Sequence, residues 1–191
     1  MRTYSLALDL SIESVEKITL LQEELAPWFE QFGIRPSWVH ADSIRLGLKS
    51  LDGVDDELLN AVSATVSGVT AKLVPFRISV REVHCLPEDN PRLVFAQIDN
   101  GSVLVDGLRK VIEAHLEKLG IPKDDRPYQP MVLIGRLPSP RQAIALPQTE
   151  IGDFNFGDSS VPHICLLRHE LLKRKSRTSV IRRFPLGTDP Q

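Results

Sequence analysis

The sequence has too little cysteine for a disulfide-rich protein and no charge excess of either sign. Only two of its 191 residues are cysteine, Cys85 and Cys165, and neither lies in a C-x-x-C pair. Two well-separated thiols in a chain without a secretion signal are typical of free cysteines. The 23 basic and 25 acidic residues nearly cancel. This balance argues against a nucleic-acid binder that is basic over its whole surface.

Long hydrophobic runs are also missing. The first ten residues alternate apolar and polar side chains, unlike the apolar run of a signal peptide. No segment approaches the ~18 apolar residues of a membrane helix. We therefore expect a cytoplasmic protein that does not interact with membranes. Hydrophobic residues make up 42% of the chain and charged residues 25%, which is typical of a folded globular protein rather than a disordered one.

The common catalytic and nucleotide-binding motifs are absent as well. The sequence contains no G-x-x-x-x-G-K-[ST] loop, no G-x-G-x-x-G, no H-E-x-x-H and no G-x-S-x-G. None of the five histidines has a second one at metal-ligand spacing. His84 and Cys85 are neighbours in a predicted strand and should point to opposite faces, which argues against a nucleophile–base pair. We expect no metal ion and no cofactor.

The sequence does contain a regular series of strand and helix patterns. Alternating and continuous apolar residues predict strands at 4–10, 44–51, 75–83, 93–98, 131–137, 163–167 and 178–184. Helical spacing predicts helices within 11–29, 55–69 and 104–119. Pro27 is expected to bend or end the first helix, and residues 138–156 are expected to form a loop. Short connections between paired strands favour an α+β fold with antiparallel sheets over a doubly wound parallel sheet.

Two of the predicted strands carry a pattern found in a known family. Trp38-Val39 precedes residues 44–51, which read Ile-Arg-Leu-Gly-Leu-Lys-Ser-Leu, and residues 126–136 read Arg-Pro-Tyr-Gln-Pro-Met-Val-Leu-Ile-Gly-Arg. This order resembles the two-histidine phosphoesterase superfamily, especially its bacterial 2′-5′ RNA ligase / RNA 2′,3′-cyclic phosphodiesterase branch. Fragments at 74–78, 91–95, 166–171 and 183–186 fit the same frame, so the resemblance spans almost the whole chain.

The resemblance implies a single bilobal α+β domain over residues 1–191. Two antiparallel sheets would flank a central cleft, with the helices outside. In the family, each of two central strands carries a His-x-Thr/Ser motif that faces the cleft. One histidine activates the attacking hydroxyl, the other protonates the leaving oxygen, and the hydroxyl side chains hold the phosphate.

The sequence departs from the family at all four motif positions. The first motif reads Arg45-Leu46-Gly47, and the second reads Met131-Val132-Leu133. Arginine does not deprotonate in proteins and therefore cannot act as a base, and methionine has no exchangeable proton. Gly47 and Leu133 offer no hydroxyl group. Because each proton-transfer group contributes ~10²–10⁴-fold to the rate, the loss of both predicts a degenerate member without the hydrolytic mechanism.

Three functional hypotheses follow from this departure. The first is a degenerate, non-catalytic phosphoesterase-like protein that binds a nucleotide, an RNA end or a protein partner. The second is an active RNA 2′,3′-cyclic phosphodiesterase or 2′-5′ RNA ligase-like enzyme that uses substitute residues. The third is a purely structural interaction module with a filled cleft.

Several cations are candidates for binding a phosphate group. Arg45, Gly47 and Lys49 alternate along one strand and are expected to share a face, while Arg136 matches an arginine that follows the family's second motif. Arg45, Lys49 and Arg136 are therefore the predicted ligand-binding residues. The segment 168–183 carries seven cations and one acid; it is either a second anion-binding surface or a solvated hairpin.

Two histidines near these strands leave alternatives open. Pro162-His163-Ile164-Cys165-Leu166 imitates the second motif, although placing the motif there would leave too little chain for the closing hairpin. His40 lies in the predicted loop before the first motif strand. It could lean into the cleft, or it could be a solvated loop residue.

Overall fold

A computed structural model describes residues 2–87, 90–138, 154–172 and 175–187. In chain order the elements are β1 (Arg2–Leu8), α1 (Ile12–Glu30), β2 (Ser37–Trp38), η1 (Ala41–Ser43), β3 (Leu46–Leu51), α2 (Asp56–Thr70), β4 (Phe76–Leu86), β5 (Leu93–Ile98), α3 (Ser102–Leu116), η2 (Glu117–Leu119), β6 (Met131–Arg136), β7 (Asn155–Val161), β8 (His163–Leu172) and β9 (Lys175–Pro185). Within these ranges, no helix combines the length and apolar composition needed to cross a membrane.

The nine strands of the described residues form one curled, antiparallel sheet. Its order is β7-β4-β5-β6-β3-β1-β8-β9, and β2 pairs beside β6. The two halves of the sheet meet where β3 pairs with β6, and the pairing recorded there is Leu46 with Val132. The predicted α+β fold with antiparallel strands is confirmed, and the described strands form one sheet that continues through this junction.

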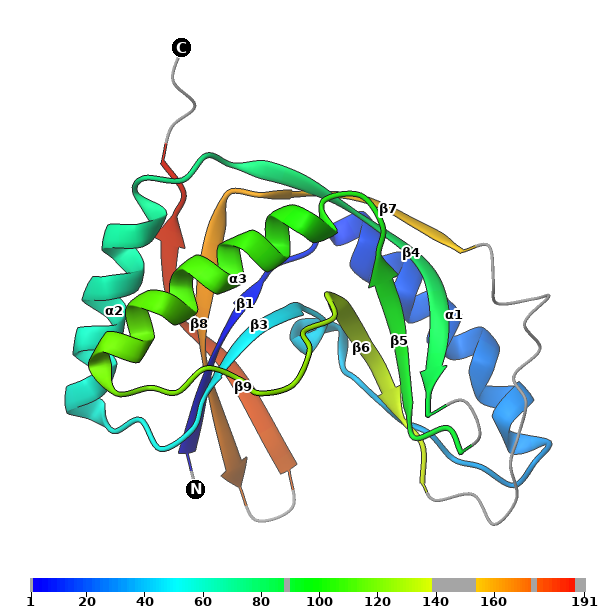
Figure 1. The fold of residues 1–191 in the computed structure, drawn as a ribbon. Helices are drawn as coiled ribbons and strands as arrows, with labels where there is room; N and C mark the ends of the chain where they lie inside the picture. Colours follow the sequence, from blue (N-terminus) through cyan, green and yellow to red (C-terminus); the bar gives the residue numbers. More distant parts are fainter. Residues whose placement is uncertain (1, 88–89, 139–153, 173–174, 188–191) are drawn as a thin grey trace.

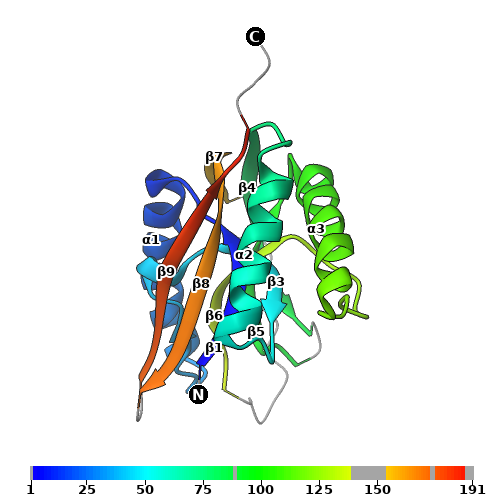
Figure 2. The ribbon, with the colours of Figure 1, turned by 90° about the vertical axis from the view of Figure 1, so that its left-hand side faces the viewer.

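The helices cover one face of the sheet in two groups (Figures 1 and 2). Helix α1 packs against β6 and β7, while α2 and α3 contact each other and pack near β9 and β3. The main hydrophobic core joins both groups to the sheet and contains Leu46, Val132 and Ile134 from the central strands. Burial of these apolar side chains is the main stabilising contribution to the fold.

Two polar contacts hold α1 against the sheet. Ser11 caps the helix by accepting a hydrogen bond from the backbone N–H of Ser14 at 3.1 Å, which satisfies one of the free donors of the first turn. The buried Gln22 donates to the carbonyls of Val39 and Ile134, each at 2.9 Å. The helix runs through Pro27 to Glu30, so Pro27 does not end it; Phe29 beyond the proline is buried in the core.

Two strands differ from the sequence prediction for physical reasons. β7 begins inside the predicted loop 138–156, of which residues 139–153 lie outside the described part of the chain. The alternation of apolar and polar residues in β7 is weak, because the polar Ser159 occupies a buried position. There its hydroxyl forms hydrogen bonds with Ser11, the cap of α1, and with Ser14 in its first turn. β3 contains a bulge. Leu6 of β1 pairs with Lys49 of β3, but the next residue, Ala7, pairs with Gly47 rather than with Leu48. Leu48 is thus the extra residue, and the alternation of side chains changes there.

A test of this packing uses the glycine at the end of β6. A Cβ atom at Gly135 would lie 2.5 Å from Cε3 of Trp38, whose ring packs against Phe29. We expect Gly135→Ala to lower the free energy of unfolding by about 1–3 kcal/mol, because the indole must move out of a packed position. Urea unfolding measures the change.

Gly107→Ala is the matched control for that substitution. Gly107 lies on the exposed side of α3, and a Cβ there meets nothing within 4 Å. Alanine at this site should stabilise the protein by roughly 0.5–1 kcal/mol through its helix propensity. Equal stabilities for wild type and Gly135→Ala would contradict the described contact between Trp38 and β6.

Candidate functional site

The fold brings the two segments with the predicted motif positions side by side at the centre of the sheet. Leu46 of β3 pairs with Val132 of β6 in antiparallel register. This register places Gly47 opposite Met131, and Arg45 opposite Leu133. Segments far apart in the sequence therefore occupy the adjacent positions that the resemblance predicted for the two motifs.

The four motif positions lie on the sheet face opposite the helices. Leu46 and Val132 are fully buried in the core beneath α1–α3, so their alternating neighbours point the other way. Gly47 is exposed, whereas Met131 and Leu133 are half-buried. Leu133 pairs with Phe95 of β5, and the Phe95 ring stacks on His84 of β4 with 5.7 Å between centroids. The second motif thus forms an apolar surface.

Arg45 is held by a carboxylate that the sequence analysis did not single out. Its Nε donates to Oδ1 of Asp9 at 2.7 Å, and its Nη1 donates to the backbone carbonyl of Asp42. Asp9 follows the last residue of β1, and Arg45 precedes the first residue of β3, so this ion pair links the ends of neighbouring strands. The Arg45 side chain is 17% exposed.

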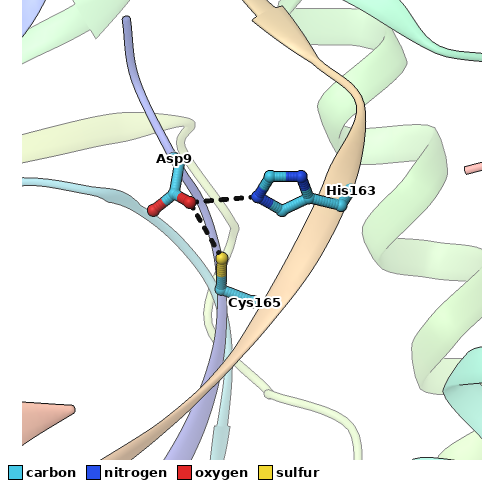
Figure 3. Close-up of side chains that lie close together, drawn as sticks. All are labelled: Asp9, His163 and Cys165. Atoms are coloured by element: carbon cyan, nitrogen blue, oxygen red, sulfur yellow. Dashed lines mark hydrogen bonds and ion pairs between the residues drawn. The ribbon is translucent and has the colours of Figure 1, made fainter. Parts of the chain in front are cut away.

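Asp9 also contacts three side chains of the closing hairpin, of which Figure 3 shows His163 and Cys165. Its Oδ2 lies 3.0 Å from Nε2 of His163 and 3.1 Å from Sγ of Cys165, both on β8. Nε of Arg183 on β9 lies 3.6 Å from the same oxygen. We call Asp9, Arg45, His163, Cys165 and Arg183 the Asp9 cluster. His163 and Cys165 share a strand face because they are two residues apart.

The cluster sets the protonation of its members. Burial alone would raise the pKa of Asp9, but hydrogen bonds from His163, Cys165 and Arg45 outweigh it and lower the pKa from 3.8 to about 2. The carboxylate is therefore ionised near neutral pH and accepts hydrogen bonds, so the Nε2 of His163 carries a proton that it donates. Burial and the adjacent Asp9 raise the pKa of Cys165 to about 12, so this thiol is protonated when no other group binds it.

Lys49 lies apart from the motif positions. Its ammonium group is 3.1 Å from Glu113 of α3 and 2.8 Å from Asp124, and its side chain is almost fully buried. The prediction that Lys49 shares a face with Gly47 is wrong, because the bulge at Leu48 turns Lys49 toward the helices. Its charge is therefore already paired within the protein.

The remaining predicted residues are also separated from Arg45. Arg136 is exposed at the far end of β6, where its backbone pairs with Ser37 and Leu93. His40 is exposed and lies 3.4 Å from Asp42, as expected for a solvated loop residue rather than one that enters the cleft. His163 does reach the site, but from β8, whose described partners are β1 and β9. β6, not β8, is therefore the neighbour of the first motif strand.

The basic segment 168–183 spreads its charges over β8 and β9. Glu170 contacts Arg168 at 3.7 Å and Arg2 at 3.3 Å, and Arg182 lies over the ring of Phe184. Arg183 belongs to the Asp9 cluster. Lys173 and Arg174 lie outside the described residues. Anion binding by the segment stays a prediction.

The loop before β6 contacts the backbone of Gly47 through Tyr128. The hydroxyl of Tyr128 donates to the carbonyl of Gly47 at 2.7 Å, and the guanidinium of Arg109 lies 4.6 Å from the Tyr128 ring centroid. Arg109 in turn donates to Glu113, one of the partners of Lys49. This chain of contacts fixes the loop that leads into the second motif.

Comparison with solved structures shows which proteins share this fold. The Thermus thermophilus protein TT0787 has 22% identity and a TM-score of 0.79 over 98% of this chain and all of the other. The E. coli protein LigT in apo form has 19% identity and a TM-score of 0.78 over 97% and 98% of the two chains.

Sequence comparison gives a relative with a curated function. An RNA 2′,3′-cyclic phosphodiesterase of Geobacillus stearothermophilus is 28% identical over 154 residues, which are 78% of this chain and 48% of that protein. The chain thus spans about half the length of this relative. No family model matches the chain.

Sequence and fold point to the same group of proteins. The chain is similar in sequence to an RNA 2′,3′-cyclic phosphodiesterase, and it shares the fold of TT0787 and LigT. The four positions that the resemblance predicts for the two motifs, Arg45, Gly47, Met131 and Leu133, lie on or beside the paired strands β3 and β6.

The low pKa of Asp9 gives a pH-dependent test of the cluster. Because the folded-state pKa lies below the unfolded value, the stabilisation is complete above about pH 4 and is lost as the pH falls toward 2. We expect Asp9→Asn to lower the free energy of unfolding by about 1–2 kcal/mol near neutral pH, with the difference from wild type shrinking in acid. Urea unfolding between about pH 6 and about pH 3 measures this.

Asp52→Asn is the control, because Asp52 is an exposed carboxylate in the turn after β3. It should leave stability within ~0.5 kcal/mol of wild type throughout this range. If the deficit of Asp9→Asn were the same at both ends of the pH range, the described ion pairing of Asp9 would be incorrect.

Proposed function

We propose that this protein is a non-catalytic two-histidine phosphoesterase-like module that binds a nucleotide or an RNA end beside its former motif positions. The observation that supports this most strongly is the pairing of β3 with β6 at Leu46 and Val132. This pairing retains the family's central strand arrangement, although neither strand carries an imidazole at its motif position.

The chemistry of the four motif side chains argues against hydrolysis by the family's mechanism. Cleavage of a cyclic phosphodiester needs one group to activate the attacking hydroxyl and another to protonate the leaving oxygen. Arg45 stays protonated and is fixed by Asp9 at 2.7 Å, so it cannot exchange protons. Met131 and Leu133 are apolar and half-buried. Loss of both proton-transfer groups lowers the rate by ~10⁴-fold or more.

The charges of the Asp9 cluster support binding of an anion. Two guanidinium groups, Arg45 and Arg183, face one carboxylate, which leaves an excess of positive charge. A guanidinium has five N–H donors, and the contacts described for Arg45 use only its Nε and Nη1. The remaining donors match the geometry of a phosphate group.

The apolar surface beside these cations supports a nucleotide rather than a free phosphate ion. Leu133 lies opposite Arg45 in the register of β3 and β6 and pairs with Phe95 of β5, while Met131 lies opposite Gly47. A base or ribose packing on this surface would gain apolar contact, while its phosphate reached the guanidinium groups. E. coli LigT, which shares the fold, has been solved in complex with 3′-AMP, with ATP and with NADP⁺.

One observation favours the alternative of an active enzyme with substitute residues. His163 bonds to Asp9 in the manner of an oriented general base, and the same carboxylate holds Arg45. His163 supplies one imidazole, whereas the reaction of the family uses two. Turnover of a 2′,3′-cyclic nucleotide that disappears in His163→Ala but persists in the exposed control His40→Ala would establish the alternative.

Binding is tested by calorimetric titration with 3′-AMP. We expect Arg183→Met to weaken the affinity by ~10–100-fold, because charge-assisted hydrogen bonds contribute about 1.5–3 kcal/mol each. Arg183 is the better choice than Arg45, because its removal leaves the ion pair between Arg45 and Asp9 intact. Thermal unfolding checks that the variant is folded.

Arg77→Met provides the matched control for that titration. It removes the same charge from β4, where Arg77 is exposed and lies near Asp158 of β7. Affinity should be unchanged in this variant. Absence of binding in wild type, or equal losses in both variants, would contradict the proposed site.

A further inference from the structure

The Asp9 cluster contains a set of metal-ligating atoms that the proposed nucleotide site does not use. Asp9, His163 and Cys165 each contribute one such atom, and these atoms all lie within 4.8 Å of one another. We propose that these three side chains bind a zinc ion with one coordination position left for an external ligand. This goes beyond the nucleotide-binding proposal and does not depend on it.

The ligand types select the metal. Thiolate sulfur, imidazole nitrogen and carboxylate oxygen are the three ligand classes of protein-bound zinc, whereas magnesium and calcium prefer oxygen alone. Three protein ligands with a fourth, open position are typical of accessible zinc sites rather than structural ones. The side chains of Asp9 and His163 are 27% and 23% exposed, so an ion can approach from solvent, while Cys165 is buried beneath them.

The spacing of the ligand atoms suits a tetrahedral site. Zinc bonds of about 2.0–2.3 Å place neighbouring ligand atoms roughly 3.3–3.6 Å apart. The Oδ2 of Asp9 lies 3.0 Å from the His163 nitrogen and 3.1 Å from the Cys165 sulfur. These two contacts therefore need to lengthen by only a few tenths of an ångström, and the His163 nitrogen lies within 4.8 Å of the Cys165 sulfur. The hydrogen bonds now made by these atoms would be replaced by bonds to the ion.

The ligands come from rigid neighbours and one of them has a fixed orientation. His163 and Cys165 alternate on β8, and Cys165 pairs with Ala7 near the end of β1, which places Asp9 alongside them. Arg45 holds the Oδ1 of Asp9, which leaves Oδ2 directed at the other two ligands. Hydrogen bonds that orient a coordinating carboxylate in this way are a regular feature of metal sites.

Proton and charge balance can be stated for the binding step. Zn²⁺ replaces the thiol proton of Cys165, the ring proton of His163 moves from Nε2 to Nδ1, and Asp9 is already ionised. One proton is therefore released to solvent for each ion bound. The thiolate and carboxylate cancel the charge of the ion, so Arg45 and Arg183 leave the assembled site positive. An anion such as phosphate is then the favoured fourth ligand.

Cobalt(II) substitution tests the site directly. We expect wild-type protein to bind about one Co²⁺ with intense visible bands of tetrahedral coordination and a near-ultraviolet thiolate-to-metal charge-transfer band, and zinc to displace it. The binding should release one proton and weaken as the pH falls. Cobalt spectra with only the weak bands of six oxygen ligands would overturn the proposal.

The two cysteines supply matched variants. Cys85→Ser removes the other thiol, which is half-buried on β4, and should leave the charge-transfer band unchanged. Cys165→Ser should abolish the band and weaken zinc binding by at least ~100-fold. If Cys165→Ser does not fold, His163→Gln is the second variant, and it should lose the tetrahedral bands. A charge-transfer band that vanishes in Cys85→Ser, or zinc affinity that is unchanged in His163→Gln, would assign the ion elsewhere.

Discussion

The ion pair between Asp9 and Arg45 is the contact on which the chemistry of this site depends. It joins the end of β1 to the start of β3, at the position where the family places its first histidine. Arg45 is a permanent cation, and the neighbouring carboxylate compensates its charge. Hydrogen bonds from His163 and Cys165, together with Arg45, lower the pKa of Asp9, and Arg45 at Oδ1 leaves Oδ2 to His163 and Cys165. The contact thus fixes the one charged side chain among the four predicted motif positions.

The scaffold around this pair has the strand arrangement on which the resemblance places the two motifs. β3 and β6 are adjacent. Gln22 of α1 binds the Ile134 carbonyl of β6, and Phe29 of α1 packs on Trp38, which lies against Gly135. The bulge at Leu48 sends Lys49 to the helix side, where it joins Glu113 and Asp124. Charge on the helix side is therefore paired within the protein, while the opposite face combines guanidinium groups with apolar side chains. That combination suits recognition of a phosphorylated organic ligand better than proton transfer.

The sequence allowed the fold and the motif strands to be predicted, but not the partners of Arg45. Apolar periodicity located the helices, and the resemblance placed both motif strands at the centre of the fold, while their register, with Arg45 opposite Leu133, came only from the structure. The β3 bulge escaped prediction because residues 44–51 were interpreted as a regular alternation, with Gly47 assigned to a motif position, although a glycine inside a strand often marks a bulge. Asp9 gave no signal because it is one acidic residue after an apolar strand. The sequence shows that His163 and Cys165 are two residues apart, but only the fold shows that Asp9 lies close enough to form a group of three metal-ligating side chains with them.

The central claim is that the site binds nucleotides without cleaving them. Phosphorus NMR of a 2′,3′-cyclic nucleotide mixed with stoichiometric protein observes both events in one sample. The account predicts a cyclic phosphate signal that shifts or broadens on addition of protein and keeps its full intensity over hours. Steady conversion of that signal to a phosphomonoester, at a rate unaffected by Arg45→Met and Met131→Ala, would contradict the account.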